Sequence, residues 1–379
     1  MLGNILRSNY IIDGIQQPLT PEAILRECAL DGVIPKDDAP EALPVIADET
    51  IDPAPSSIDL DSTDITSSLK AVSSLHGRCV PGPFAGPYTA EKIAGALIDT
   101  IWMGGHFRLG DLTLKAEWKW NGEKIGNMAA FYASVEAAGS YIDSLGLRIS
   151  SLGLSQGACS VSFKAVTTEE EDPNQDEDEE GLFGELPFRT ASPRISRRRK
   201  CPATILPERS DWLVYVPFDS CDFRLGGSAL EEATSPGAGT APEIGDADYF
   251  IDCFEVVREL VEDGVVRAGA SVGNGGLMTA LSKMAESGAG ASISIGDICR
   301  AYGNEKPLRV LFSEVPGVIL QIADIDYDYI DAEFLLQDIA YFPLGHPDPS
   351  ADGISVIAGG KTGIGGILDS LLGSKEGED

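Results

Sequence analysis

The sequence predicts an α+β or α/β layered fold, because strand and helix patterns alternate along most of its 379 residues. Apolar residues recur at helical spacing in some segments and at strand spacing in others, which is typical of helices packed on a sheet. In chain order, the predicted elements are a helix at 87–105, a strand at 112–120, a helix at 127–145, a strand at 212–216, helices at 249–263 and 277–287, and a strand at 318–322. This length allows two domains with sizeable cores.

Composition and charge exclude several classes of partner and site. The net charge is −32, so nucleic acid and anionic membranes are not expected as partners, since phosphate binding needs clustered Lys and Arg. No apolar run approaches the roughly 18 residues of a membrane span, and no signal peptide pattern opens the chain. The seven cysteines are scattered singly, which argues against a zinc site or a disulfide framework. We therefore expect a cytoplasmic protein.

Residues 1–70 are interpreted as an N-terminal segment followed by a linker. Thr20 is a candidate N-cap with Pro21 at the first helical position, and the helix that they begin is expected to end near Leu30. The chain from 36 to 57 is rich in Pro, Asp and Ala, as linkers often are.

Residues 71–165 form the first predicted domain. The helix that begins near Pro87 carries Ile93, Leu97 and Ile101 on one side, and the strand at 112–120 alternates apolar and polar residues. The helix at 127–145 also has an apolar face and is followed by Gly146, a typical stop. Its face is expected to pack in the core.

A charged insertion is predicted at 166–200. Nine of the twelve residues from Glu169 to Glu180 are acidic, and a basic run, RISRRRK, follows at 194–200. High charge with few apolar residues cannot offset chain entropy, so a disordered loop is expected. A nuclear-import or nucleic-acid role is an alternative for the basic run, but the neighbouring acidic block competes for it.

The second predicted domain covers residues 201–345, and a tail covers 346–379. The tail contains GGKTGIGG at 359–366, which lacks the first glycine of a phosphate loop, so a turn is the better interpretation.

Within the second domain, the more informative stretch is SVGNGGLMTALSKMA, which starts at Ser271. Gly275 and Gly276 precede a helix there, and unpaired N–H groups at a helix start can hold a phosphate. A tight turn without a ligand is the alternative interpretation.

Three segments together resemble a known family. They are DWLVYVPFDSCDFRLGGSAL from Asp211, the stretch from Ser271, and LFSEVPGVILQI from Leu311. In order and spacing, most of residues 87–345 resembles phosphoribosylformylglycinamidine synthase (formylglycinamide ribonucleotide amidotransferase) of the large single-chain type. The resemblance covers only the second A-type and B-type synthetase pair, and it implies A and B domains like those of aminoimidazole ribonucleotide synthetase.

The resemblance also implies site residues. It places nucleotide-binding positions at Gly157, Ser160, Ser162, Asn274, Gly275, Gly276 and Glu314. It places Asp99 as a magnesium ligand, while Gly95 and Ser271 stand where the family has Glu and Asp. Ala158 and Cys159 likewise replace a Lys and an Asp. The loss of these charges implies that Mg-ATP or Mg-ADP binds weakly at best. An ordinary core strand is the alternative for Ser160 and Ser162.

The resemblance implies a purine-biosynthesis protein that needs other chains. No cysteine nucleophile elbow is present, so the family's route for releasing ammonia from glutamine is not expected here. The first synthetase half and a glutaminase would have to come from partner chains, and this chain alone is expected to be inactive. In the family the A-type sheets pair, so an exposed apolar sheet face and a homodimer or heteromer are expected. A non-catalytic scaffold that reuses the fold is the alternative.

Overall fold

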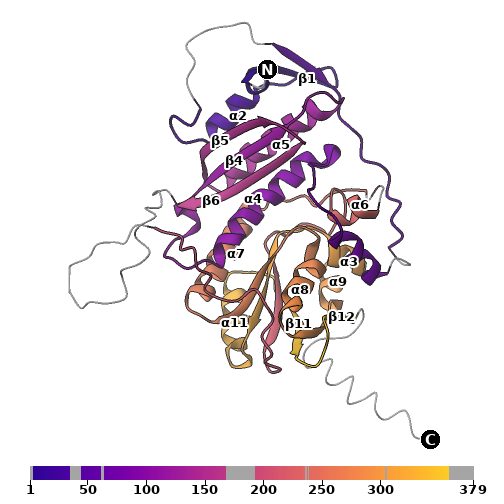
Figure 1. Cartoon of the computed structure of the whole chain (residues 1–379). Helices are drawn as coiled ribbons and strands as arrows, with labels where there is room; N and C mark the ends of the chain where they lie inside the picture. Colours follow the sequence, from indigo (N-terminus) through magenta and orange to yellow (C-terminus); the bar gives the residue numbers. More distant parts are fainter. Residues whose placement is uncertain are drawn as a thin grey trace, which may run out of the picture.

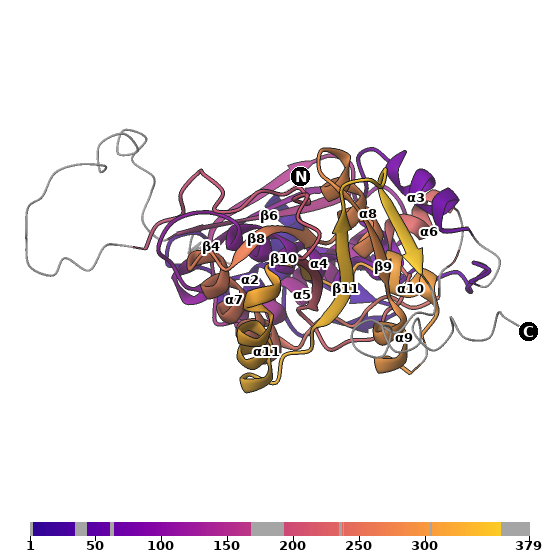
Figure 2. The same ribbon diagram turned by 90° about the horizontal axis from the view of Figure 1, so that it is seen from below.

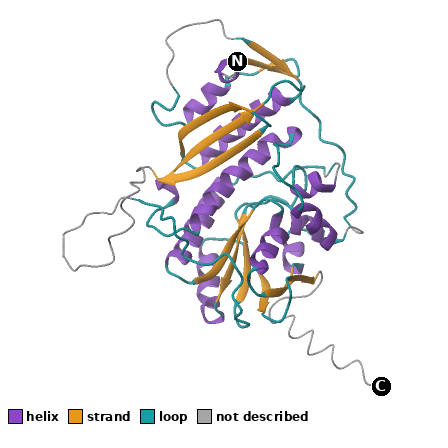
Figure 3. Ribbon diagram, viewed as in Figure 1, coloured by secondary structure: helices purple, strands orange, loops and turns teal. Residues whose placement is uncertain are grey.

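The computed structural model describes residues 3–34, 44–60, 64–167, 193–234, 237, 239–303 and 305–357. It consists of two layered units, one above the other in Figure 1. The upper unit is a three-stranded sheet with two long helices, and the lower unit is a six-stranded sheet with helices on both faces. Figure 3 shows the same division by secondary structure. This architecture confirms the α+β layered fold.

The helices of the described residues are α1 (Gly3–Arg7), α2 (Pro21–Glu27), α3 (Ile65–Ser73), α4 (Ala85–Ile101), α5 (Asn127–Ser144), α6 (Ala229–Thr234), α7 (Ala247–Glu262), α8 (Gly276–Glu286), α9 (Gly296–Ala301), α10 (Pro307–Phe312) and α11 (Tyr327–Leu336). The strands are β1 (Asn9–Ile12), β2 (Ile15–Gln16), β3 (Val45–Asp48), β4 (Leu112–Trp120), β5 (Arg148–Gln156), β6 (Ser160–Thr167), β7 (Trp212–Pro217), β8 (Val266–Val272), β9 (Gly290–Ser294), β10 (Gly317–Ile322), β11 (Phe342–Asp348) and β12 (Ile354–Ile357). Every predicted helix and strand is present, with ends shifted by a few residues.

The upper sheet has the order β5-β4-β6 and is covered on one face by α4 and α5. Strand β4 runs parallel to β5 and antiparallel to β6. Its inward residues include Trp118 and Trp120, which are each 1% exposed. The Trp118 indole N–H donates to Ser134 Oγ of α5 over 3.0 Å, so the strand and helix are joined by both packing and a hydrogen bond.

The outward face of this sheet is polar, and the expectation of an apolar open face is wrong. Strand β4 alternates strictly, so Lys115, Glu117 and Lys119 point away from the helices and are exposed. Ser162 and Lys164 of β6 pair with Glu117 and Lys115 on the same face. The reason offered for a homodimer, burial of apolar surface, therefore does not hold for this sheet.

The N-terminal segment builds a small sheet, β2-β1-β3, beside the upper unit. The start of α2 confirms the predicted cap, because Thr20 Oγ1 accepts from the Ala23 N–H over 3.2 Å, although the helix ends at Glu27, earlier than expected. Strand β3 ends at Asp48, whose carboxylate accepts from the N–H groups of Gly126 and Met128, both over 2.8 Å. Since α5 has no cap of its own, Asp48 caps it from another element.

The lower sheet has the order β12-β9-β11-β7-β10-β8. Strand β10 is buried along its whole length, because both of its neighbours are antiparallel strands and both faces are covered. Val318 and Leu320 point into the core that includes α7 and α11, whereas Ile319 points to the core that includes α8 and α10. Figure 2 shows these two helical groups on opposite sides of the strands.

One connection differs from the expectation. The basic run at 194–200 was expected to be disordered, but residues 193–200 are hydrogen-bonded along the chain after α4. The Gly104 N–H donates to the Arg198 carbonyl over 2.8 Å, and the Lys200 N–H donates to the Trp102 carbonyl over 2.8 Å. Arg199 lies over the Trp102 ring, so backbone pairing and stacking hold this run. The acidic block at 169–180 and the glycine-rich tail at 359–366 lie outside the described residues.

The chain between the N-terminal sheet and α4 crosses to the lower unit. Helix α3 packs against α6 and α8 (Figure 1). The Ser57 N–H donates to the Gly237 carbonyl over 2.8 Å on the way. Among the described residues, no helix is long and apolar enough to cross a membrane. The path of residues 64–81 matters for the site, since it delivers Arg78 to the boundary between the two units.

Candidate ligand site between α4 and the start of α8

One face of α4 lies along strand β8 and the loop that follows it. Ser271 Oγ donates to Asp99 Oδ1 over 2.6 Å and accepts from the Trp102 indole N–H over 2.8 Å. The family resemblance placed both Asp99 and Ser271 at site positions. They are 172 residues apart in the chain, and the structure brings them together. Gly95 is one turn before Asp99 on the helix, and a Cβ built there would meet no atom within 4 Å.

Asn274 faces two cationic side chains. Its Oδ1 accepts from Lys92 Nζ of α4 over 2.6 Å and from Arg78 Nη1 over 2.9 Å. Both cations also lie near the Tyr88 ring, with Lys92 Nζ 4.5 Å from its centroid. The sequence reasoning found Asn274 but missed Arg78 and Lys92, because nothing in the local sequence connects residue 78 with residue 274.

The Gly275–Gly276 turn is required by packing. Both residues have left-handed backbone conformations, with φ of 80° and 70°. A Cβ at Gly275 would lie 2.5 Å from Thr279 Oγ1, and one at Gly276 would lie 2.6 Å from the Ser313 carbonyl oxygen. These contacts favour the tight-turn interpretation, since glycine is needed here without any ligand.

The anion position expected at this helix start is filled by Glu314. Its Oε1 accepts from the Gly275 N–H over 2.6 Å and from the Ala229 N–H over 3.0 Å, and Arg78 Nη1 donates to it over 2.7 Å. The Gly276 N–H instead donates to the Gly273 carbonyl over 2.8 Å. The expectation of free N–H groups at Gly275 and Gly276 is therefore wrong, because a carboxylate of the chain itself and a backbone carbonyl accept these bonds.

A second carboxylate, Glu91, is buried beside this cluster. It is 5% exposed, and Lys92 Nζ lies 2.7 Å from its Oε2, although no hydrogen bond of good geometry reaches that oxygen. Burial raises the pKa of Glu91; Lys92 opposes the rise and Glu314 adds to it. Burial by itself would lower the pKa of Lys92, but Glu91 reverses the effect and the pKa of Lys92 is raised.

The same balance applies to Arg78. Burial by itself would lower its pKa, but the charge of Glu314 and the hydrogen bond to it reverse the effect, so the pKa of Arg78 is raised. Arg78 also donates to Glu232 over 2.9 Å and to the Gly227 carbonyl over 2.7 Å. A cavity of about 470 Å³ opens beside Arg78, and Tyr88, Asn274, Gly275 and Lys283 also line it.

The other predicted nucleotide-binding residues lie elsewhere. Gly157 is in the turn between β5 and β6, while Ser160 and Ser162 are on β6 with Ser162 on the exposed polar face. In the described part of the chain, none of the three has a hydrogen bond to Asn274, Gly275 or Glu314. The strand interpretation is correct for both serines, but they lie on the open face and not in the core.

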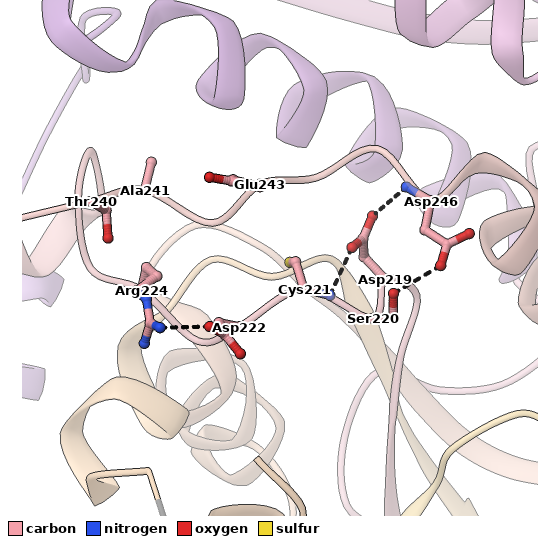
Figure 4. A pocket seen from close by; sticks show the side chains of 9 residues that line it. All are labelled: Asp219, Ser220, Cys221, Asp222, Arg224, Thr240, Ala241, Glu243 and Asp246. Carbon is pink, nitrogen blue, oxygen red and sulfur yellow. Dashed lines mark hydrogen bonds and ion pairs between the residues drawn. The ribbon is translucent and has the colours of Figure 1, made fainter. Parts of the chain in front are cut away.

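A second pocket, of about 330 Å³, lies beyond the end of β7 and is drawn in Figure 4. Asp219 is 2% exposed and is fully engaged with backbone: Oδ1 accepts from the Cys221 N–H, and Oδ2 accepts from the Gly245 and Asp246 N–H groups. Asp222 pairs with Arg224. Asp219 thus joins the loop after β7 to the residues before α7, whereas Asp222 pairs within its own loop. Within the described ranges no group of three or more His, Cys, Asp or Glu is placed to hold a metal.

Magnesium does not fit the residues present between α4 and α8. Mg²⁺ prefers carboxylate and phosphate oxygens in octahedral geometry. Asp99 is the carboxylate that the sequence suggested, and one of its oxygens already accepts from Ser271. Asn274 Oδ1, an amide oxygen at the same boundary, accepts from two cations. A divalent cation at Asn274 would be repelled by Lys92 and Arg78.

A match to a family model shows which class of domain the lower unit resembles. Residues 211–328 match the family model described as AIR synthase related protein, C-terminal domain. The matched part of the lower unit is therefore similar to an AIR synthase-related C-terminal domain, and it has the α+β fold described above. The solved structure of T. maritima PurL complexed with FGAR is similar in fold, with a TM-score of 0.52 and 14% identity over 73% of this chain and 42% of that chain.

The curated relatives are phosphoribosylformylglycinamidine synthases. The Homo sapiens protein is 28% identical over 161 residues, which are 40% of this chain and 12% of the human protein. The probable phosphoribosylformylglycinamidine synthase of Caenorhabditis elegans is 33% identical over 110 residues, which are 27% of this chain and 8% of that protein. This chain is thus similar to a part of phosphoribosylformylglycinamidine synthase, and it spans only about a tenth of the length of these relatives.

Proposed function

We propose that this chain is the second synthetase half of a phosphoribosylformylglycinamidine synthase-type assembly in purine biosynthesis, and that it works with partner chains. Its sequence similarity to the human and nematode enzymes and its fold similarity to T. maritima PurL support the proposal. The partners would be a first synthetase half and a glutaminase, and a cytoplasmic location is part of the proposal. In this assembly the chain contributes a folded A-type and B-type unit, and the reacting groups belong to its partners.

The proposal has a second part, which is that the chain alone binds nucleotide weakly. The observation that carries this part is the hydrogen bond from the Gly275 N–H to Glu314, at 2.6 Å. A phosphate at this helix start would have to displace a buried carboxylate that also pairs with Arg78. Desolvated charge pairs of this kind are costly to break from one side. The isolated chain is therefore proposed to bind Mg-ATP or Mg-ADP no tighter than about millimolar, which corresponds to roughly 4 kcal/mol of binding free energy.

One experiment tests activity and nucleotide binding together. The chain is co-purified with a first synthetase half and a glutaminase from the same source, and formation of formylglycinamidine ribonucleotide from ATP and glutamine is measured with and without it. We expect activity only in the complete mixture, and calorimetry on the chain alone should show no micromolar Mg-ADP binding. A mixture that is equally active without the chain would rule out the proposed role.

A second candidate is a non-catalytic interaction protein that reuses the fold. The polar outward face of β4 favours it, because Lys115, Glu117 and Lys119 leave no apolar surface there for a sheet-to-sheet contact of the family type. Failure of the chain to associate with either synthetase partner at micromolar concentration, together with stable folding alone, would favour this candidate.

A further inference from the structure

The boundary between α4 and the lower unit contains a charge-balanced set of four side chains, Arg78, Lys92, Glu91 and Glu314, called here the charge quartet. Their side chains are 10%, 16%, 7% and 6% exposed, respectively. Charged side chains are rarely buried to this extent unless they are paired. Two of them are positive and two negative, so the quartet is neutral as a unit.

The negative member Glu314 occupies a position built for an anion. Three donors converge on its Oε1: the Gly275 N–H at 2.6 Å, the Ala229 N–H at 3.0 Å and Arg78 Nη1 at 2.7 Å. Gly275 is the N-cap of α8, where the partial positive charge of the helix favours an anion. Charge-assisted bonds of this kind are stronger than neutral ones.

The positive members, Lys92 and Arg78, lie next to Glu314 at a position that suits a cation. Asn274 Oδ1 accepts from Lys92 Nζ at 2.6 Å and from Arg78 Nη1 at 2.9 Å. Lys92 Nζ also lies 2.7 Å from Glu91 Oε2. An amide oxygen and a carboxylate oxygen, both of which can bind a metal ion, are thus turned toward an ammonium group.

We propose that the charge quartet is an internal substitute for a bound cation and anion. Glu314 stands in for the anion and Lys92 with Arg78 for the cation, so α4 and the α8 turn are held together without a ligand. This goes beyond the proposed role in an assembly, because it concerns the isolated chain and holds whichever partners the chain has. The quartet makes this boundary independent of magnesium and of phosphate.

Chemical rescue of the full chain tests the anion position. Glu314→Ala removes the carboxylate and leaves Arg78 and two N–H groups around a small cavity. We expect its Tm to fall by several degrees and to be partly restored by acetate or inorganic phosphate, but not by chloride at the same ionic strength. The Tm of the unaltered chain should not change when magnesium and pyrophosphate are added or when a chelator is present.

Conservative variants keep the test decisive if the alanine variant does not fold. Glu314→Gln and Lys92→Met keep shape but remove charge, and each should lower the Tm more than its matched control, Glu286→Gln or Lys283→Met. The controls line the neighbouring cavity but are exposed. Stabilisation of the unaltered chain by magnesium pyrophosphate, absence of anion rescue in a folded Glu314→Ala protein, or conservative variants no less stable than their controls would each overturn the proposal. None of these readouts depends on partner chains, so failure here is distinct from failure of the assembly role.

Discussion

Arg78 and Glu314 form a buried ion pair, with 2.7 Å between Nη1 and Oε1, although 236 residues separate them in the chain. Arg78 belongs to the segment between α3 and α4, and Glu314 belongs to the turn before β10. The pair therefore fixes an N-terminal segment onto the loop before a central strand of the lower sheet. Arg78 also lies 5.4 Å from the centroid of the Tyr88 ring, so the pair contacts α4 of the upper unit.

Replacing Arg78 by Met should destabilise the chain strongly. The carboxylate of Glu314 would remain buried without its countercharge, and breaking a buried pair from one side costs about 3–5 kcal/mol. Urea unfolding followed by tryptophan fluorescence measures the loss. The matched control is Arg209→Met, which removes a surface pair with Asp348 whose side chains are 68% and 42% exposed. The control should lose at most about 1 kcal/mol, and an equal loss in both variants would contradict the assigned role.

Asp48→Ala should remove the cap of α5 and an acid-dependent part of the stability. Burial by itself would raise the pKa of Asp48, but hydrogen bonds from Gly126, Ala129 and Met128 lower it overall, from an ordinary value of 3.8. A carboxyl group with a lowered folded-state pKa stabilises the protein above pH 3.8, and this contribution is lost as the pH falls through the folded-state pKa.

Unfolding at several pH values therefore checks the Asp48 prediction. The unaltered chain should exceed Asp48→Ala by about 0.5–2 kcal/mol near neutral pH, and the difference should shrink on acidification. Glu49→Ala, which changes the exposed neighbour, should show no such difference. A gap between the unaltered chain and Asp48→Ala that stays constant down to low pH would mean that Asp48 acts by packing and not as a charged cap.

Glu91→Gln should change the pH dependence of stability in the direction opposite to that of Asp48→Ala. Burial raises the pKa of Glu91 above its ordinary value of 4.5, so its contribution is fully present below pH 4.5 and is lost as the pH rises through the raised folded-state pKa. A glutamine side chain at this position does not titrate. The stability of the unaltered chain relative to Glu91→Gln should therefore decrease as the pH rises from about 4.5. A relative stability that increases over this range would show that the Lys92 pair dominates over burial.

Arg199→Ala tests whether the basic run stabilises the fold. Arg199 Nη2 donates to the Gly269 carbonyl over 2.8 Å, and its guanidinium lies 5.5 Å from the Trp102 ring centroid. Loss of the bond and the stacking should cost about 1–2 kcal/mol. Arg198→Ala is the control, because Arg198 contributes its backbone carbonyl to the pairing with Gly104. Equal stabilities of the two variants would mean that the side chain of Arg199 has no structural role.

The sequence by itself determined several of the elements and their faces. Strict alternation in LTLKAEWKW predicted β4 with the correct bounds, and helical spacing with Gly146 behind it predicted α5 to within one residue. Local periodicity and caps suffice for such elements, since they depend on neighbours a few residues away. Alignment with the family also selected Asp99, Ser271, Asn274 and Glu314, which the fold brings to one boundary.

Only the tertiary structure decided what these residues do there. Arg78 and Lys92 reach Asn274 across 196 and 182 residues, and no local pattern encodes such a contact. The carboxylate of Glu314 reaches the N–H of Gly275 because α8 begins beside the loop before β10, which turned a predicted phosphate position into an internal one. The side chains of β4 alternated as predicted, but only pairing with β6 showed that Lys115 and Lys164 share an open polar face. Long-range contacts decide the chemistry of a site because burial and opposite charges act through space and not along the chain.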